Sequence, residues 1–335
     1  MAQSPPPMPN LPPEGPQRVI FVLMPQFTLI ALAGAMDCLR IANRVADRTL
    51  YDWRLVSVDG RDTLCSAGAL FRVESGLPDP RPGDMIVIAG GLDIRDHASA
   101  GVLDWLGAEA AKGGIVAGIC TGAYILARAG LLGGRQATIH WENHESTAGE
   151  FPDILLTRAV FTRDANCVTC AGGTAVIDMM LGLIAATHGQ ALAMGVADQM
   201  IYASIRTDQD TQRLSIPTRI GVRHTRLAQV IEAMERHIQT PVSPAEMARE
   251  AGLSTRQLER LFRRYLGRTP KRYYLELRLQ RARNLLLQTA MTVTEVARAS
   301  GFATPAHFSR CYRAQYGATP YRERGAPEPK ATVAD

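Results

Sequence analysis

The sequence predicts an α/β domain with a mostly parallel sheet, followed by an all-α domain that contains two helix-turn-helix units. Three observations predict this fold class. Short apolar runs alternate with helical patterns from residue 18 to about 190, a segment near the C-terminus occurs twice, and positive charge is concentrated around that repeat. At 335 residues the chain is long enough for two ordinary domains.

The N-terminal domain is predicted from five apolar runs that are bounded by turn residues. The expected strands are RVIFVLM (18–24), WRLVSV (53–58), DMIVIAGG (84–91), GGIVAGIC (113–120) and NCVTCAGG (166–173). Helical patterns separate them, at 29–47, 99–112, 122–130 and 174–189. This alternation is typical of a parallel sheet covered by helices. Ligands of such domains bind at the carboxyl ends of the strands, so a site is expected there.

Cys120 lies at the junction between the fourth strand and the helix that begins with Gly122. This is the position of a nucleophile elbow, in which a tight turn exposes the side chain. The start of a helix is also expected to lower the pKa of the thiol. His140 follows in the sequence, and the two side chains are a candidate nucleophile and base pair. A small packing cysteine at the end of a strand is the alternative.

This domain resembles the PfpI-like branch of the class I glutamine amidotransferase fold over most of residues 18–190. The resemblance rests on the AGG triplet ending at Gly91, on GICTGAYILARAGLLGGRQATIHW from Gly118, and on CAGGTAVIDMMLGLI from Cys170. It implies a flavodoxin-like sandwich in which the elbow cysteine is the nucleophile of the enzymes, with Asp37 as the acid near it. The residues expected to bind an effector are Asp37, Gly90, Gly91, Cys120, Thr121, His140, Trp141, Glu142 and Thr174.

The C-terminal domain is predicted from an internal repeat in which Ser243–Pro270 matches Thr292–Pro320. Each copy opens on a capping box, formed by Ser243 with Glu246 and by Thr292 with Glu295. Pro244 occupies the first helical position, where its missing N–H costs nothing.

A glycine ends the first helix of each copy, because Gly252 and Gly301 tolerate the positive φ of a tight turn. A second helix is expected to begin at about Thr255 or Thr304, which completes a helix-turn-helix. One side of each second helix is apolar, and the other is expected to contact phosphates and base edges in a major groove. The candidate DNA-binding residues are Thr255, Arg256, Gln257, Arg260, Arg263, Arg264, Thr304, His307, Arg310 and Arg313.

The charge distribution supports a polyanionic partner for this end of the chain. Residues 219–324 contain 20 Lys and Arg against 8 Asp and Glu, a net charge of +12, whereas the rest of the chain has a net charge of −7. A helical bundle with solvated arginines is the alternative. The sequence between the two copies suits one long helix, which would hold the two units about one turn of DNA apart.

The C-terminal region resembles the AraC/XylS family of regulators over about 100 residues, Arg226–Arg324. The resemblance rests on the A-x-x-A/S-G-[LF] turns, the GRTP and GATP endings, and RLQRARNLL from Arg278. It implies that helices at about 255–265 and 304–316 are the recognition helices. With the PfpI-like domain in front, the chain resembles the GlxA-like regulators, which implies an N-terminal domain that senses a metabolite and drives dimerisation.

We therefore expect a sequence-specific DNA-binding transcriptional regulator, an activator of catabolic genes, that senses a small nitrogen-containing metabolite. A quaternary ammonium compound or an amino acid would place its cation against Trp141 and its carboxylate at the amides after Cys120. Asp37 or Glu142 would balance the cation. Expected partners are double-stranded DNA, the effector, a second copy bound through the N-terminal domain, and RNA polymerase. No cofactor or metal is expected.

Two alternatives remain open from the residues. The first alternative to the regulator hypothesis is an active PfpI-type cysteine hydrolase or hydratase with a DNA-binding tail. The second is an architectural DNA-binding protein with an inert front domain. For the first alternative the candidates are Cys120 and His140, which the regulator hypothesis treats as vestigial.

The expected domain boundaries follow from composition and pattern. They are a disordered Pro-rich lead (1–17), an effector-sensing domain (18–203), a linker (204–223), a DNA-binding domain (224–325, with units at about 242–265 and 291–316) and a disordered tail (326–335). No signal peptide or membrane span is expected, which favours the cytoplasm and the nucleoid. A reducing compartment disfavours disulfides, and the CxxC of Cys167 and Cys170 lacks a second ligand pair, so buried structural thiols are expected.

Overall fold

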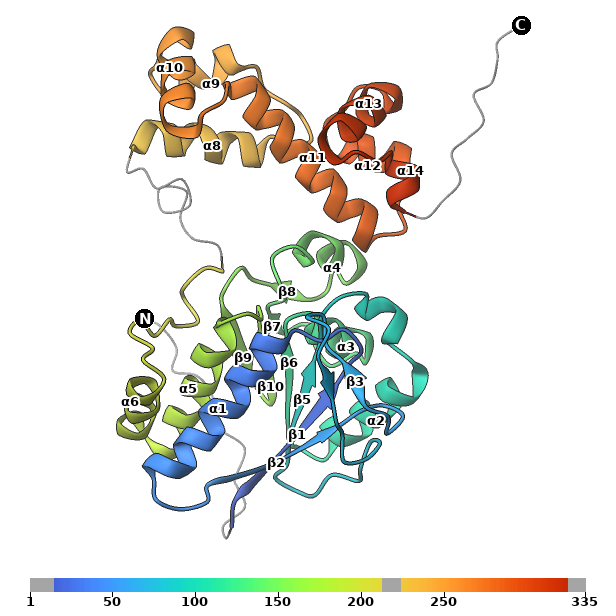
Figure 1. Cartoon of the computed structure of the whole chain (residues 1–335), viewed down its shortest axis with the longest axis vertical. Coiled ribbons are helices and arrows are strands. Elements are labelled where there is room, and N and C mark those ends of the chain that lie inside the picture. Colours follow the sequence, from blue (N-terminus) through green and yellow to red (C-terminus); the bar gives the residue numbers. More distant parts are fainter. Residues whose placement is uncertain (1–14, 213–223, 325–335) are drawn as a thin grey trace, which may run out of the picture. The chain divides into compact units, whose positions relative to one another are not determined.

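The computed structural model describes residues 15–212 and 224–324. They divide into two compact domains, with the division between Gln212 and Arg213 (Figure 1). Residues 1–14 of the predicted lead, residues 213–223 of the predicted linker and the predicted tail lie outside the described residues.

The N-terminal domain is built on one six-stranded sheet with the order β2-β1-β5-β6-β10-β9. The strands are β1 (Gln17–Leu23), β2 (Tyr51–Val56), β5 (Met85–Ala89), β6 (Ile115–Ile119), β9 (Phe161–Asp164) and β10 (Cys167–Cys170). Neighbouring strands are parallel except at the edge, where β9 is antiparallel to β10. Each of the five predicted runs forms a strand, so the mostly parallel sheet is confirmed.

Two small sheets lie outside the main one. They pair β3 (Thr63–Leu64) with β4 (Leu70–Phe71), and β7 (Gln136–Ala137) with β8 (Leu155–Leu156). These two-residue strands have no detectable periodicity, and the sequence did not predict them.

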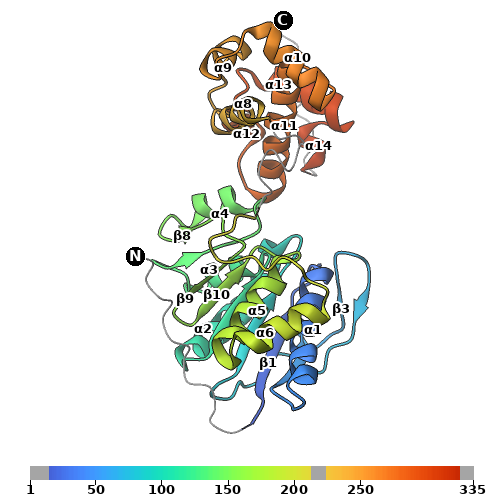
Figure 2. The ribbon, with the colours of Figure 1, turned by 90° about the vertical axis from the view of Figure 1, so that its left-hand side faces the viewer.

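Helices cover both faces of the main sheet (Figures 1 and 2). They are α1 (Leu29–Val45), the 3₁₀ turn η1 (Ile94–His97), α2 (Ala100–Ala111), α3 (Gly122–Arg128), α4 (His144–Glu150), α5 (Ala175–His188) and α6 (Gln190–Gln199). Buried side chains of α1, α5 and α6 pack on one face, and those of α2 and α3 on the other. Since both faces are covered, every residue of β5 and β6 is buried.

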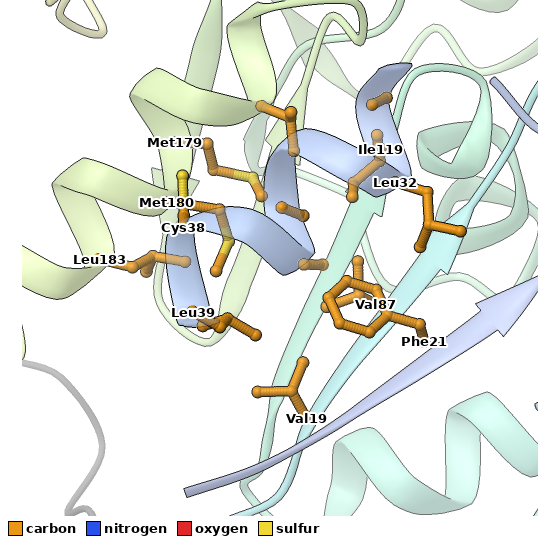
Figure 3. Close-up of a cluster of buried hydrophobic side chains, with 14 of the residues drawn as sticks. Val19, Phe21, Leu32, Cys38, Leu39, Val87, Ile119, Met179, Met180 and Leu183 are labelled. Carbon is orange, nitrogen blue, oxygen red and sulfur yellow. The ribbon is translucent and has the colours of Figure 1, made fainter. Parts of the chain in front are cut away.

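The larger core cluster joins α1 and α5 to the sheet (Figure 3). Phe21 of β1, Val87 of β5 and Ile119 of β6 contribute from the sheet, and Leu39 and Met180 contribute from the helices. All five side chains are fully or almost fully buried. This packing fixes the carboxyl ends of the central strands, where the candidate effector site lies.

The C-terminal domain is all helical. Its helices are α8 (Thr225–Arg236), α9 (Pro244–Glu250), α10 (Thr255–Leu266), α11 (Pro270–Gln288), α12 (Val293–Ala299), α13 (Pro305–Tyr316) and α14 (Pro320–Glu323). One core cluster is formed by α8, α9, α10 and Tyr274 of α11, and another by α12, α13 and the later turns of α11. The long helix α11 is thus shared by two small cores, as the sequence predicted.

The predicted repeat is confirmed in its caps and turns. Ser243 and Thr292 are N-caps, and each forms a complete capping box with the glutamate three residues later. Gly252 and Gly301 have φ of +64° and +75°, which an L side chain adopts only with strain. We call α9 with α10 the first head, and α12 with α13 the second head.

The cysteines are free thiols, and Cys167 and Cys170 lie buried in β10. Within residues 15–212 and 224–324, no cluster of three His, Cys, Asp or Glu side chains that would hold a metal is found. None of the helices in the same ranges combines the length and the apolar character needed to cross a bilayer.

Candidate functional site

The candidate DNA-binding side chains of the first head project from the solvent side of α10. Leu258 and Phe262 are fully buried, whereas Arg256, Arg260 and Arg263 are exposed. At 100° per residue these three arginines fall within about 60° of one another, on the side opposite the buried pair. The structure therefore gathers them on one basic face.

Residues of α8 that the sequence did not single out lie beside this face. A groove of about 420 Å³ is lined by His224, Thr225 and Arg226 together with Gln257 and Arg260. Arg226 also donates a hydrogen bond to the carbonyl of Gly252, at 3.3 Å. The excess of basic residues before α8 was the available signal, but its position relative to α10 depends on tertiary packing.

Two predicted contact residues are also engaged in helix capping. In the first head Ser254 is the N-cap of α10. The backbone N–H of Ser254 donates a hydrogen bond to the side chain of Gln257 at 2.8 Å. In the second head Thr304 is itself the N-cap, and its hydroxyl accepts from the N–H of His307. The expected helix starts at about Thr255 and Thr304 are confirmed, and the residue of the first head that is equivalent to Thr304 is Ser254.

The second head has fewer arginines and more aromatic packing. Arg310 and Arg313 are exposed on α13, opposite the buried Phe308 and Tyr312. His307 is exposed, yet its Nε2 lies 3.4 Å from Cys311 Sγ and its ring is edge-on to Phe302. These contacts fix the orientation of the imidazole.

Besides the shared helix, contacts with the segment after α8 and with the start of α11 fix the position of the second head. A Cβ on Gly301 would lie 2.2 Å from the carbonyl oxygen of Ile238, so the turn of the second head abuts the loop that follows α8. The hydroxyl of Tyr274 donates to the carbonyl of His237 at 2.6 Å, and Arg272 donates to the amide oxygen of Gln315. The spacing of the two basic faces is therefore built into the domain.

The backbone at Cys120 forms the expected elbow, but the side chain is buried and not exposed by the turn. Cys120 has φ of +58° between β6 and α3, and its N–H donates to the carbonyl of Cys170 at 3.0 Å. Gly172 packs so closely that an added Cβ would lie 2.6 Å from Cys120 Cβ. The sulfur accepts a hydrogen bond from the hydroxyl of Thr28, at 3.7 Å, which the sequence did not predict.

The expectation of a lowered thiol pKa is wrong. Burial raises the pKa of Cys120, and the hydrogen bonds from Thr28 and from the N–H of Thr121 oppose this only in part. Within the described residues, Thr28 and not His140 is the side chain bonded to the sulfur. Burial also lowers the pKa of His140 below 6.5, so that its imidazole is neutral at pH 7. The pair is thus not arranged as an activated nucleophile and base.

The prediction for Asp37 also needs correction. Asp37 lies on the outer side of α1, half exposed, in an ion pair with Arg40. Asp37 lies nine positions after Thr28 in the sequence. On a helix this places it about 13 Å further along the axis, on the opposite side of the helix. The acid expected near the cysteine therefore faces solvent, and the corresponding position beside the thiol is occupied by the Thr28 hydroxyl.

The other predicted effector residues fall into two groups. Gly90 and Gly91 allow close backbone approach, since an added Cβ would lie 2.2 Å from the Gly122 nitrogen and 1.8 Å from the Gln26 oxygen. Thr121 is buried and donates to the Gly91 carbonyl. These residues shape the elbow, whereas Thr174 is exposed at the start of α5.

The segment after β7 provides the polar wall of the candidate effector site. Trp141 is 37% exposed, and its ring lies beside that of His140 with centroids 5.7 Å apart. Glu142 Oε2 lies 3.7 Å from His140 Nδ1, and the carboxylate is near enough to raise the pKa of Cys120. His140, Trp141 and Glu142 therefore lie together, and Glu142 is near enough to affect the pKa of Cys120, whereas Asp37 faces solvent.

Comparison with known proteins matches both domains. The DJ-1/PfpI family matches residues 17–186, and the helix-turn-helix domain family matches residues 247–326. The HTH-type transcriptional regulator GbdR of Pseudomonas aeruginosa is 40% identical over 94% of this chain and 87% of its own length. GlxA of Rhizobium meliloti, also an HTH-type transcriptional regulator, is 35% identical over 91% of this chain and 94% of its own length.

A solved structure agrees with these relatives. The crystal structure of an AraC family transcriptional regulator from Pseudomonas putida is 29% identical, with a TM-score of 0.50. It covers 55% of this chain and all of the solved chain.

Proposed function

This chain belongs to the GlxA-like, AraC-type transcriptional regulators, in which a DJ-1/PfpI domain precedes a helix-turn-helix domain, and from this premise we propose that it activates catabolic genes in response to a small cationic metabolite. Its full-length relatives are transcriptional regulators, and this chain is likewise a DNA-binding regulator and not an enzyme. The proposal concerns what it senses, where the effector binds and which residues contact DNA.

The observation that carries the proposal is that the ion-pair partner of Glu142 is a neutral imidazole. Among the described residues its ion-pair partner is His140, and the lowered pKa of His140 leaves that partner neutral at pH 7. Among the residues that the structure describes, the recorded partner of the Glu142 carboxylate is therefore an uncharged imidazole, and the next residue, Trp141, has a partly exposed ring. A quaternary ammonium or amino group fits such a wall, because a carboxylate and an aromatic face both attract cations.

The expected ligand is an amino acid or a betaine-like compound of this charge type. Its cation would lie between Trp141 and Glu142, and its carboxylate would lie toward the elbow, where the Thr121 N–H points at Cys120. Cys120 then lines the site without reacting, which is consistent with a thiol that burial keeps protonated. Asp37 has no part in this arrangement.

We also propose that two copies associate through the N-terminal domain. Leu64 and Leu70 face each other in the β3–β4 hairpin and are 43% and 66% exposed. The loop at Gln26 bonds to the backbone of Leu64 and of Leu92, another exposed apolar side chain. An apolar surface of this kind supports association with a second copy. As an activator the chain would also contact RNA polymerase, and it would act in the cytoplasm at the nucleoid.

Titration calorimetry of the full chain tests the effector proposal. Glycine betaine, carnitine and arginine are titrated into wild type, Glu142→Gln, Trp141→Ala and Asp37→Asn. At least one compound should bind wild type, and both site variants should weaken its binding by about tenfold or more, because each variant removes an ion pair or a cation–π contact. Asp37→Asn is the matched control and should bind as wild type does. Absence of heat with all three compounds contradicts the proposal.

A further inference from the structure

The segment that leaves the N-terminal domain is bonded to that domain at two points, one near Thr174 and the other near Ile139. We call residues 202–212, which follow α6 and precede the undescribed residues 213–223, the exit strap. Its first anchor is Asp178 of α5, whose side chain is fully buried. Asp178 accepts from the backbone N–H and Nε of Arg206, at 2.7 and 2.8 Å, and from the hydroxyl of Tyr202 at 3.0 Å.

This first anchor would be costly to break. A buried carboxylate is tolerated only when it is paired and hydrogen-bonded, and within the described residues the donors to Asp178 come from the strap. Arg206 extends the contact, because its Nη2 donates to the hydroxyl of Thr174 at 2.9 Å. Thr174 follows the two glycines that begin at Gly172, the residue packed against Cys120. The first anchor thus ends at one wall of the site.

The second anchor is Gln212, the last residue described before the gap. The Nε2 of Gln212 lies 2.7 Å from the Thr138 hydroxyl, 2.9 Å from the Ile139 carbonyl and 3.1 Å from the Ala159 carbonyl. Its backbone N–H donates to Arg158 O. Ile139 directly precedes His140, so the second anchor ends next to the segment that contains His140, Trp141 and Glu142.

Between the two anchors, backbone hydrogen bonds also join the strap to the N-terminal domain. The N–H of Val160 donates to the carbonyl of Asp210, and Thr211 forms an antiparallel bridge with Ala159. Thr138 is in turn bonded through its N–H to the hydroxyl of Thr169, in β10 beside Cys170. The Oε1 of Gln212 is shielded from solvent and has no partner among the described residues, so it is able to accept a donor.

We propose that the exit strap transmits the state of the effector site to the DNA-binding domain. The anchors at Asp178 and Gln212 hold the chain where it leaves the domain. A ligand that displaces the wall at Ile139 and His140 competes with the Gln212 anchor and frees residue 212, from which the chain runs to the second domain. The inference rests on the proposed position of the effector site.

Thermodynamic linkage makes the proposal reciprocal. If ligand binding loosens the strap, then loosening the strap by mutation must move the ligand-free protein toward its ligand-bound output. Gln212→Ala removes the second anchor. Gln209→Ala is a matched control on the same strap, because within the described part of the chain the hydrogen bonds of Gln209 reach only Thr207 and Asp208.

The test uses the full chain and a promoter that it occupies in cells, identified by chromatin immunoprecipitation and fused to a reporter. Without added amine, Gln212→Ala should change the reporter output by about fivefold or more at equal protein level, the lower end of usual coupling between sites. Gln209→Ala should give the wild-type output. Tyr202→Phe removes one hydrogen bond to Asp178 and should change the reporter output in the same direction as Gln212→Ala. It replaces Gln212→Ala in the test if Gln212→Ala does not accumulate in cells.

Output identical to wild type from Gln212→Ala and Tyr202→Phe, at wild-type protein level, overturns the strap proposal. The same reporters are then given glycine betaine, carnitine or arginine. If the wild-type reporter does not respond to any of the three compounds, the proposed effector class is contradicted. The strap proposal is still decided by the comparison without added amine.

Discussion

The two heads of the C-terminal domain have the same helix-turn-helix plan and are stabilised by different contacts. With Ser254 and Thr304 as equivalent N-caps, Arg260 corresponds to Arg310 and Arg263 to Arg313. Arg256 and Arg264 of the first head correspond to Ala306 and Ala314. The first head therefore has the larger positive charge, and we expect it to supply more of the attraction to phosphates.

The second head has more packing where the first has charge. Phe302, Phe308, Tyr312 and Tyr316 form a continuous series of ring contacts, with successive centroids 4.7 to 5.5 Å apart. Its turn also receives Arg278 from α11, which stacks on Phe302 and donates to two turn carbonyls. The comparison teaches that a repeated motif conserves its caps and turn, while the means of stabilising it differ between copies.

The largest expected difference between the heads is at their turn glycines. Gly301→Ala should destabilise the second head by about 4 kcal/mol, from left-handed strain and from overlap with the carbonyl of Ile238. Gly252→Ala, whose Cβ meets nothing within 4 Å, should cost about 1 kcal/mol. Amide hydrogen exchange of the full chain measures the opening free energy of α12–α13 and of α9–α10. Equal costs would show that the turn of the second head is not packed against residue 238.

A smaller difference is expected at the arginines that contact the two turns. Arg278→Ala should cost the second head about 2 kcal/mol, since it removes a stacked cation and leaves the carbonyls of Ser300 and Gly301 without their donor. Arg226→Ala removes one long bond from an exposed side chain and should cost the first head less than about 0.5 kcal/mol. The same exchange measurement compares them, and a reversed order would contradict the assigned roles.

The heads should not differ at their capping boxes. Hydrogen bonds from Ser243, chiefly from its hydroxyl, hold the pKa of Glu246 below 4.5, and those from the N–H and hydroxyl of Thr292 do the same for Glu295. A carboxyl whose pKa is lowered in the folded state stabilises it above the unfolded pKa and loses this effect as the pH falls through the folded pKa. NMR titration of the two carboxyls should give similar midpoints, both below 4.5. An ordinary midpoint for one of them would show that its cap is open.

Periodicity and caps were sufficient to predict the fold. Strands such as β5 and β6 are buried on both faces, so they read as continuous apolar runs, and the two capping boxes mark helix starts locally. The pairs β3–β4 and β7–β8 are too short to have a period. The edge strand β9 was missed because its residues FTRD contain no apolar alternation.

The candidate effector site was predicted in part. The elbow and the H-W-E segment were found because they follow local sequence signals. Asp37 was placed wrongly because its direction depends on which side of α1 faces the sheet, and Thr28 was missed because its contact with Cys120 joins residues far apart in the sequence. The exit strap was likewise beyond prediction, since each of its anchors is a tertiary contact.

The central claim is that two unequal heads on α11 contact DNA through the exposed sides of α10 and α13. Affinity of the full chain for its promoter, measured over a series of salt concentrations, tests it most directly with Arg260→Ala, Arg310→Ala and the control Arg61→Ala in the N-terminal domain. Each head variant should lose about 1–3 kcal/mol of binding free energy if its arginine contacts a guanine, and the control should lose none. Wild-type affinity, sequence preference and salt dependence in both head variants would contradict the claim.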